Sequence, residues 1–332
     1  MKQLEEIRQK LLESKKPLFF FDDDCDGLTS FIQLYRLVGD GKGICVKGKP
    51  ELEEKYADKV KDYGPDLVVI LDKPMVSPEF FQKVKTPIIW IDHHEVQQTH
   101  GITYFNSREF GKEYPTSYIC YLLSKQSIWL ALVGIVGDWQ LFLKNEFNKK
   151  YPDLLGKNIN TPGEALFQTK LGKLVKIINF NLKGSSKDVS KSIATLVGIK
   201  EPHDILEKKT DDGKFIYSRY EKINREYEEL LSQAQVEENF VLLKYFGNKM
   251  ALSSDLSNEL LYKHMDKLIL IARERNDKVI MSLRSKKHNL PKILDEILPR
   301  HGGLGGGHKN ACGASIPSES FEGFLEDLKE RI

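Results

Sequence analysis

Carboxylate side chains gather where short apolar segments of the sequence end. Asp22, Asp24 and Asp26 lie in the acidic run Asp22–Gly27, which directly follows the apolar segment Pro17–Phe21. Carboxylates this close raise one another's pKa unless a cation lies among them. The alternative is a solvated acidic turn that caps the following helix, where negative charge is favourable. This run alone leaves a metal site and a helix cap equally open.

Two further polar groups follow apolar segments in the same way. Asp72 follows Leu67–Leu71, and Asp92-His93-His94 follows the segment 87–91. A single aspartate after a strand is usually a turn former. In an open parallel sheet, however, the carboxyl ends of the strands lie along one crevice, where ligands bind. We therefore expect the three groups to meet at one place.

The types of these side chains indicate which ion they would hold. Asp138 follows an apolar helical segment and Gly137, and it can close the site from the side. Carboxylate oxygens with imidazole nitrogens, and without thiolates, suit Mn²⁺ or Mg²⁺ better than structural zinc. The carboxylates suffice for two ions with Asp72 as the bridge, and two ions ~3.5–4 Å apart are a usual device for phosphoester hydrolysis.

A second chemical signal lies near the C-terminus. The stretch His301–Ser315 is rich in glycine, and its His308 and Lys309 can add positive charge. A glycine loop lets backbone N–H groups approach a phosphate, although it can equally be a plain flexible turn. Upstream, Ser282–Ser285 ends an apolar segment with Arg284, which is either a phosphate ligand or a surface arginine.

The apolar segments also predict the elements that position these groups. Pro17–Phe21, Leu67–Leu71 and the segment 87–91 alternate with helix-capable stretches such as Leu28–Val38, which is the pattern of βαβ units and a parallel sheet. Residues 115–138 are expected to be helical, ending in the apolar run before Gly137-Asp138.

The rest of the chain predicts a second, smaller α/β domain. Strands are expected over Phe240–Tyr245, Leu268–Ala272 and Val279–Leu283, and the charged stretch 218–237 predicts a solvated connecting helix. The expected organisation is a first domain over 1–210, a connecting helix over 211–238 and a second domain over 239–332.

The overall composition excludes several classes of protein. The 332 residues include 40% hydrophobic side chains, enough for a core, and 50 Lys+Arg against 48 Asp+Glu. The longest apolar runs fall short of the about 18 residues that span a membrane. The four cysteines are far apart and the start of the chain has no apolar signal segment, so we expect a cytoplasmic protein without a membrane partner.

The net charge of +2 argues against binding nucleic acid by bulk electrostatics. The acidic residues nevertheless include a cluster that two divalent ions would neutralise, adding about +4 at the site of the substrate's phosphates. Binding is therefore expected to be local, which favours short or single-stranded substrates.

Taken together, these motifs resemble those of the DHH phosphoesterase superfamily. Asp92-His93-His94 matches the motif that names the superfamily, and Asp22–Gly27 matches the first motif of its RecJ-type exonucleases. Asp72 and Gly137-Asp138 resemble the second and fourth motifs. Ser282–Ser285 and the stretch 306–313 resemble the motifs of the C-terminal DHHA1 domain of the family. The resemblance spans nearly the whole chain and is closest to RecJ-like proteins of archaeal type and to the nanoRNase branch.

The resemblance implies a role for each matched residue. It implies that the metal ligands are Asp22, Asp24, Asp72, His93 and Asp138. It places His94 at the scissile phosphate, Asp92 behind the histidines, and Asp26 in support of the site or in proton transfer. It assigns the binding of a substrate phosphate to Ser282, Arg284, Gly306, Gly307, His308 and Lys309, with the two domains closing over the substrate.

The resemblance also implies an activity, namely Mn²⁺-dependent release of nucleoside monophosphates from single-stranded DNA, RNA or short oligonucleotides, with two ions and with Mg²⁺ as an alternative. Three alternatives remain: a bisphosphate-nucleotide phosphatase, a cyclic-dinucleotide phosphodiesterase, and an inactive replisome scaffold. A homo-oligomer and a DNA repair or replication partner are left open.

Two positions depart from the pattern of the superfamily. Many members carry a histidine at the position of Asp22 or four residues earlier, where this chain has Leu18, so the first metal site is expected to bind weakly or only with substrate. The small residue that usually follows the second-motif aspartate is replaced by Lys73-Pro74, which places a cation beside the metals.

Overall fold

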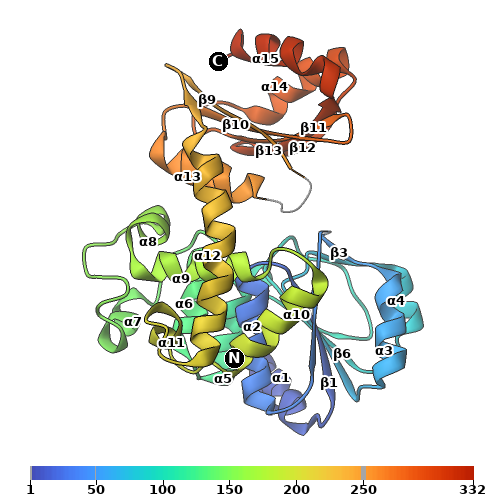
Figure 1. Cartoon of the computed structure of the whole chain (residues 1–332). Coiled ribbons are helices and arrows are strands. Elements are labelled where there is room, and N and C mark those ends of the chain that lie inside the picture. The colour runs from blue at the N-terminus through green and yellow to red at the C-terminus, as the bar shows by residue number, and fades with distance from the viewer. Residues whose placement is uncertain (1, 49, 248–251) are drawn as a thin grey trace. The chain divides into compact units, whose positions relative to one another are not determined.

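The computed structural model describes residues 2–48, 50–247 and 252–332 (Figure 1). The chain divides into two compact units, Met1–Tyr220 and Glu221–Ile332, and the division falls inside helix α12 (Asp211–Ser232). The domain limits expected from the sequence stay a prediction. In the part of the chain that is described, no helix is both long and apolar enough to cross a membrane.

The first unit is built on a five-stranded sheet in which every pairing is parallel, as the apolar pattern predicts. The strand order is β2-β1-β4-β6-β7. The strands are β1 (Pro17–Asp22), β2 (Lys42–Val46), β4 (Leu67–Leu71), β6 (Ile88–Asp92) and β7 (Thr103–Asn106). Because β2 lies on one side of β1 and β4 on the other, the order reverses at β1. The carboxyl ends of β1 and β4 therefore border the crevice where such sheets bind ligands.

Successive residues of β1 enter two different cores. Leu18 and Phe20 belong to a buried cluster with residues of α3 (Ala57–Tyr63) and α4 (Pro78–Lys83). Phe19 and Phe21 face the other side, where their rings lie 5.4 and 4.6 Å from that of Phe31 in α2 (Cys25–Val38). Leu18 is thus a core residue at the start of the strand, since its side chain is fully buried four residues before Asp22.

The helical character expected over 115–138 is present, but the stretch is not continuous. The structure has two helices there, α5 (Thr116–Ser124) and α6 (Ile128–Gly137), separated by Lys125 and Ser127 with φ of 55° and 49°. All residues of α6 before Gly137 are buried. The break lets this apolar helix run through the core and end at Asp138.

Shorter elements complete the first unit. The remaining helices and strands are α1 (Lys2–Glu13), α7 (Lys144–Lys150), α8 (Pro162–Gln168), α9 (Lys170–Asn181), α10 (Ser186–Gly198), α11 (Pro202–Leu206), β3 (Glu51–Leu52) and β5 (Met75–Val76). The charged helix expected over 218–237 is α12, which begins earlier and ends at Ser232. Its solvated character is only partial, because Tyr217, Tyr220, Ile223 and Tyr227 are buried.

The second unit contains a six-stranded sheet of order β12-β13-β11-β10-β9-β8, in which only the β9–β10 pairing is parallel. Its strands are β8 (Gln235–Val236), β9 (Phe240–Phe246), β10 (Leu268–Arg275), β11 (Lys278–Arg284), β12 (Leu304–His308) and β13 (Ala311–Pro317). One face packs on α14 (Leu290–Ile297) and α15 (Phe321–Lys329) in a common core. Helix α13 (Ser253–Lys263) contacts β10 and β11.

The three strands expected in this unit are present, but the prediction of a glycine-rich loop near the C-terminus is wrong. Leu304–His308 forms the edge strand β12, and Lys309-Asn310 turns the chain into β13. A Cβ on Gly305 would lie 2.6 Å from the carbonyl oxygen of Gly313, so this glycine is needed for close backbone approach between the strands.

The start of α2 lies so close to β1 that only glycine fits at position 27. A Cβ there would be 2.7 Å from the backbone nitrogen and oxygen of Asp22. We expect Gly27→Ala to lower the free energy of unfolding by about 1–3 kcal/mol in urea denaturation. Gly198→Ala is the matched control because its Cβ would make an ordinary contact, 3.5 Å from Asp212. Equal stability of the two variants would contradict this packing.

Candidate metal centre

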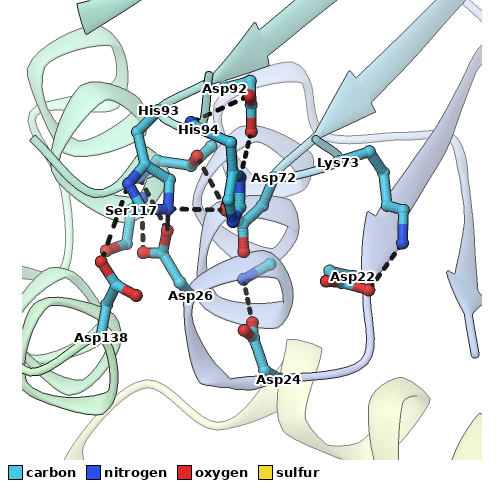
Figure 2. A network of polar contacts seen from close by, with 12 residues as sticks. Asp22, Asp24, Asp26, Asp72, Lys73, Asp92, His93, His94, Ser117 and Asp138 are labelled. Carbon is cyan, nitrogen blue, oxygen red and sulfur yellow. Dashed lines mark hydrogen bonds and ion pairs between the residues drawn. The ribbon is translucent and has the colours of Figure 1, made fainter. Parts of the chain in front are cut away.

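The aspartates and histidines predicted from the sequence converge at the carboxyl edge of the parallel sheet (Figure 2). They come from the ends of β1, β4 and β6, from the start of α2 and from the end of α6. The converging residues are Asp22, Asp24, Asp26, Asp72, Asp92, His93, His94 and Asp138. Two sets of ligand atoms, each within 4.8 Å of one another, can hold an ion: Asp22–Asp24–Asp72 and Asp72–His93–His94. Asp72 belongs to both sets, as expected for a bridge.

The acidic run after β1 also caps helix α2. Asp24 is the N-cap residue, and its Oδ1 accepts a hydrogen bond from the Gly27 N–H at 2.9 Å. The two interpretations of this run are thus compatible, because the same carboxylate satisfies the helix end and faces Asp22 and Asp72.

Asp26 anchors a second helix. Its buried carboxylate accepts hydrogen bonds from the backbone N–H groups of Thr116 (2.7 Å) and Ser117 (2.9 Å), at the N-terminus of α5. Both donors are unpaired within the helix, and the carboxylate matches the positive end of its dipole. Thr116 in turn donates from Oγ1 to Asp72 Oδ1 at 3.2 Å. The sequence interpretation missed Thr116, because a threonine at the start of a helix gives no signal of a partner 44 residues away.

Asp72 is held in an unusual backbone conformation. Its φ is 58°, a region that residues other than glycine rarely adopt, at a cost of about 1–3 kcal/mol that is typical of functional sites. The residue is 1% exposed, and its N–H donates to the Ile91 carbonyl. Burial, and repulsion from Asp26 and Asp24, raise its pKa well above the ordinary value.

The two histidines have different surroundings. His93 is buried, with Nε2 3.2 Å from Asp72 Oδ1 and Nδ1 3.8 Å from Asp138 Oδ2. Burial lowers the pKa of His93, and the negative charge of Asp26 offsets only part of this decrease. The lowered pKa favours the neutral imidazole, which can bind a metal. His94 is 40% exposed at its side chain, and its Nδ1 lies 2.8 Å from Asp92 Oδ1.

Asp92 orients His94 from below the surface. It is fully buried, and its Oδ2 also accepts the His94 backbone N–H at 3.0 Å. Burial lowers the pKa of His94, but the hydrogen bond and the charge of Asp92 outweigh burial and raise it overall. Asp92 thus holds the ring, while Asn106 donates a hydrogen bond to the His94 carbonyl and holds its backbone.

The carboxylates of the group repel one another. Burial, and the charges of Asp26 and Asp24, raise the pKa of Asp138 to about 9. Loss of hydration, and repulsion from Asp22 and Asp26, raise the pKa of Asp24 to about 7. Asp24 is exposed to solvent, and water weakens the effect of lost hydration on its pKa. Repulsion from Asp22 and Asp26 is therefore the main reason for the raised pKa. Such crowding fits a site for a divalent cation.

One positive charge is already present beside the group. The Lys73 ammonium lies 2.8 Å from Asp22 Oδ1, and Figure 2 shows the side chain reaching from the end of β4 to the end of β1. Burial raises the pKa of Asp22, and Lys73 acts in the opposite direction. The sequence placed a cation near the metals, but its partner became apparent only in the structure.

The predicted phosphate-binding residues lie in the second unit. Strand register aligns Ser282, Gly313 and Gly306 in one row, and Arg284, Ala311 and His308 in the row two residues further, which lies on the same face of the sheet. Arg284 is half-buried and is positioned by hydrogen bonds from Nη1 to Ser282 Oγ (3.1 Å) and from Nε to Asn258 Oδ1 (3.2 Å).

The glycines of β12 leave the sheet bare beside this arginine. No atom within 4 Å would meet a Cβ on Gly306, while Gly307 has a φ of 148° and closely approaches Ala311. His308 and Lys309 are exposed at the end of the strand. The sheet thus places Arg284 in a neighbouring row to an open glycine surface.

The chain is similar to a known domain family and to several solved structures. Residues 238–332 match the family model described as the DHHA1 domain. Over the whole chain, a manganese-bound exonuclease RecJ superposes with a TM-score of 0.64 at 15% identity, covering 100% of this chain and 94% of the other. RecJ of Thermus thermophilus with Mn²⁺ gives 0.62 at 14%, covering 100% of this chain and 55% of the other. The pGpG-specific phosphodiesterase PggH of Vibrio cholerae gives 0.52 at 14%, covering 96% and 98%. The comparison with curated protein sequences gives no match.

These similarities confirm the resemblance expected from the motifs. The chain has the fold of the RecJ structures, with a parallel-sheet N-terminal part, and its C-terminal residues 238–332 match the DHHA1 domain. The chain spans about half of the Thermus RecJ protein, 55% of its length. At identities of 14–15%, the activities in these names are those of the other proteins.

The raised pKa of Asp138 predicts how the metal-free chain responds to pH. A folded-state pKa of about 9, against 3.8 for the ordinary carboxyl, gives stability that is present below pH 3.8 and lost as the pH rises towards 9. In EDTA at about pH 8.5 we expect Asp138→Asn to melt at least about 3 °C above wild type, and this gain should shrink steadily as the pH is lowered towards about 4. The exposed Asp58→Asn is the control, with no change at either pH. A lower melting temperature of Asp138→Asn at the higher pH would contradict the repulsion.

Proposed function

We propose that this chain is a Mn²⁺-dependent phosphodiesterase that releases nucleoside monophosphates from short or single-stranded oligonucleotides. The observation that carries the proposal is the convergence of crowded carboxylates and two histidines at the switch point of a parallel sheet. Carboxylate oxygen and imidazole nitrogen are ligands that Mn²⁺ and Mg²⁺ accept. Proteins of the same fold include RecJ structures that contain Mn²⁺ or Mg²⁺.

In this proposal the chain's own residues hold the ions and the substrate. The ligands are Asp22, Asp24, Asp72, His93 and Asp138. Bound ions supply an activated water and neutralise charge on the phosphoryl oxygens. His94 is the partly exposed group, oriented by Asp92, that would face the scissile phosphate.

The structure adds a further candidate ligand and a changed role. His94 lies within metal-ligand distance of Asp72 and His93, so it is an alternative ligand as well as a candidate for the phosphate. The Asp26 carboxylate accepts hydrogen bonds from two backbone N–H groups at the start of α5. We propose that Asp26 positions Thr116 and Asp72 and takes no part in proton transfer.

The second unit would bind a phosphate of the substrate through Arg284, with Ser282, Gly306, Gly307, His308 and Lys309 around it. The support is the hydrogen-bonded and half-buried guanidinium beside glycines that leave room for a ligand. Guanidinium matches the geometry of phosphate oxygens.

A cyclic-dinucleotide or linear-dinucleotide phosphodiesterase is the second candidate, supported by the shared fold of a pGpG-specific phosphodiesterase. A bisphosphate-nucleotide phosphatase would use the same chemistry on a smaller substrate. An inactive scaffold is disfavoured, because the five proposed ligands are all present in the sequence.

The proposal predicts Mn²⁺-dependent hydrolysis that fails when the carboxylates are removed. We expect the double variant Asp24→Ala, Asp72→Ala to lose at least about 100-fold in the rate of mononucleotide release from 5′-labelled di- to pentanucleotides. The matched control is Asp58→Ala, Asp62→Ala, which removes two exposed carboxylates of α3 and leaves the rate unchanged.

Two outcomes decide between the candidates. Equal rates for wild type and the double variant with Mn²⁺ would sink the enzyme proposal, because the product would then come from a contaminant. Rapid hydrolysis of a bisphosphate nucleotide, without release from oligonucleotides, would replace the leading candidate by the phosphatase.

Arg284 gives a separate prediction for substrate binding. Arg284→Gln is expected to raise KM for dinucleotides about tenfold, the loss of a charge-assisted contact of about 1.4 kcal/mol, with a smaller change in kcat. Arg300→Gln is the control, since Arg300 is exposed elsewhere in the same unit. The same KM for both variants would show that Arg284 does not bind the substrate.

A further inference from the structure

A fully buried lysine lies beside the candidate metal centre. The Lys73 side chain is 0% exposed, and its Nζ is 2.8 Å from Asp22 Oδ1 (Figure 2). Its backbone carbonyl accepts the indole N–H of Trp90 at 3.0 Å, which fixes the chain at the end of β4. Because no part of the side chain reaches the surface, Lys73 is not a contact for substrate.

Burial of an ammonium group requires a specific reason. Removing this charge from water costs several kcal/mol unless a carboxylate and further polar groups compensate for the loss. Asp22 supplies that carboxylate from a strand 51 residues earlier. Lys73 also directly follows Asp72 in the chain, so the residue that supplies the cation adjoins one member of the carboxylate group and its ammonium pairs with another.

Lys73 reduces what Asp22 can offer to an ion. Oδ1 of Asp22 already accepts two hydrogen bonds, from Lys73 Nζ at 2.8 Å and from the Asp23 N–H at 3.0 Å. The ammonium therefore pairs with one of the three carboxyl groups of the Asp22–Asp24–Asp72 group and occupies one of its oxygens. A divalent ion at this group would be attracted less and would face a fixed positive charge.

The other group is built differently. In Asp72–His93–His94, two imidazoles join the shared carboxylate, and Asp138 and Asp26 lie 3.8 Å from the His93 ring nitrogens. The two groups share Asp72, but only the Asp22–Asp24–Asp72 group has the Lys73 ammonium paired with one of its members.

We propose that Lys73 is a built-in monovalent cation that makes the two metal positions unequal. The Asp72–His93–His94 group holds its ion tightly, and the Asp22–Asp24–Asp72 group holds a weak, exchangeable ion. The inference rests on the proposed function, because it concerns the ions of that same centre. Lys73 acts through Asp22 and is a positioning residue.

The inference is tested by counting bound Mn²⁺ in the full chain. Metal-free protein is titrated with Mn²⁺, and the free ion is measured by its EPR signal, a readout that needs no catalysis. Wild type is expected to bind two ions with affinities at least tenfold apart. Lys73→Met keeps an unbranched chain of similar length without the charge, and it should tighten the weak ion at least tenfold while changing the tight ion less than twofold.

Matched variants separate charge from other effects. Lys83→Met removes an exposed lysine that pairs with Glu54 and should leave both affinities unchanged. Adding Asp22→Asn to Lys73→Met should abolish the gain, because the freed carboxylate is then lost. If Lys73→Met does not fold, Lys73→Gln replaces it in the same titration, because Gln removes the charge but keeps a polar group beside Asp22. The weak ion should again bind more tightly.

The outcomes distinguish this inference from the proposed function. Two ions of equal affinity in wild type, or a weak ion that is unchanged or weakened by both Lys73 variants, would overturn the role of Lys73 and leave the enzyme proposal intact. Absence of Mn²⁺ binding in wild type would overturn both. As a second readout, the Mn²⁺ concentration for half-maximal hydrolysis should fall at least tenfold in Lys73→Met.

Discussion

Repulsion among carboxylates at the ends of β1, β4 and β6 is the constraint on which the rest of the structure depends. The fold offsets part of this repulsion with its own groups. The N-terminus of α2 satisfies Asp24, the N-terminus of α5 satisfies Asp26, and Lys73 pairs with Asp22. The remainder is visible in the raised pKa values of Asp72 and Asp138. A divalent cation relieves the same repulsion, which links stability, metal binding and the proposed chemistry.

The near-balanced charge of the chain is consistent with this local arrangement. The acidic side chains that count as negative in the sequence include a tight cluster that bound divalent ions would neutralise. The second unit has basic side chains of its own, because strand register sets Arg284 of β11 and His308 of the exposed glycine strand β12 in one row, on either side of Ala311 in β13. Both features favour recognition of a few phosphates over binding along a duplex.

Much of the fold and site could be predicted from the sequence because their signals are local. Apolar segments of strand length ending in Asp22, Asp72 and Asp92 predict a parallel sheet with converging side chains, and the sheet has this form. The pairing of Lys73 with Asp22, and of Thr116 with Asp72, joins distant segments and leaves no pattern in either one. The break at Lys125–Ser127 and the strand character of Leu304–His308 also depend on packing and pairing that composition does not encode.

The central claim is that the carboxylate cluster is a metal centre, and the most direct measurement is anomalous X-ray diffraction from crystals grown with Mn²⁺. The account predicts a strong anomalous peak bounded by Asp72, His93 and His94, and a weaker one bounded by Asp22, Asp24 and Asp72. Crystals with Mn²⁺ in excess that show no anomalous peak at these residues, or peaks only elsewhere on the protein, would contradict it.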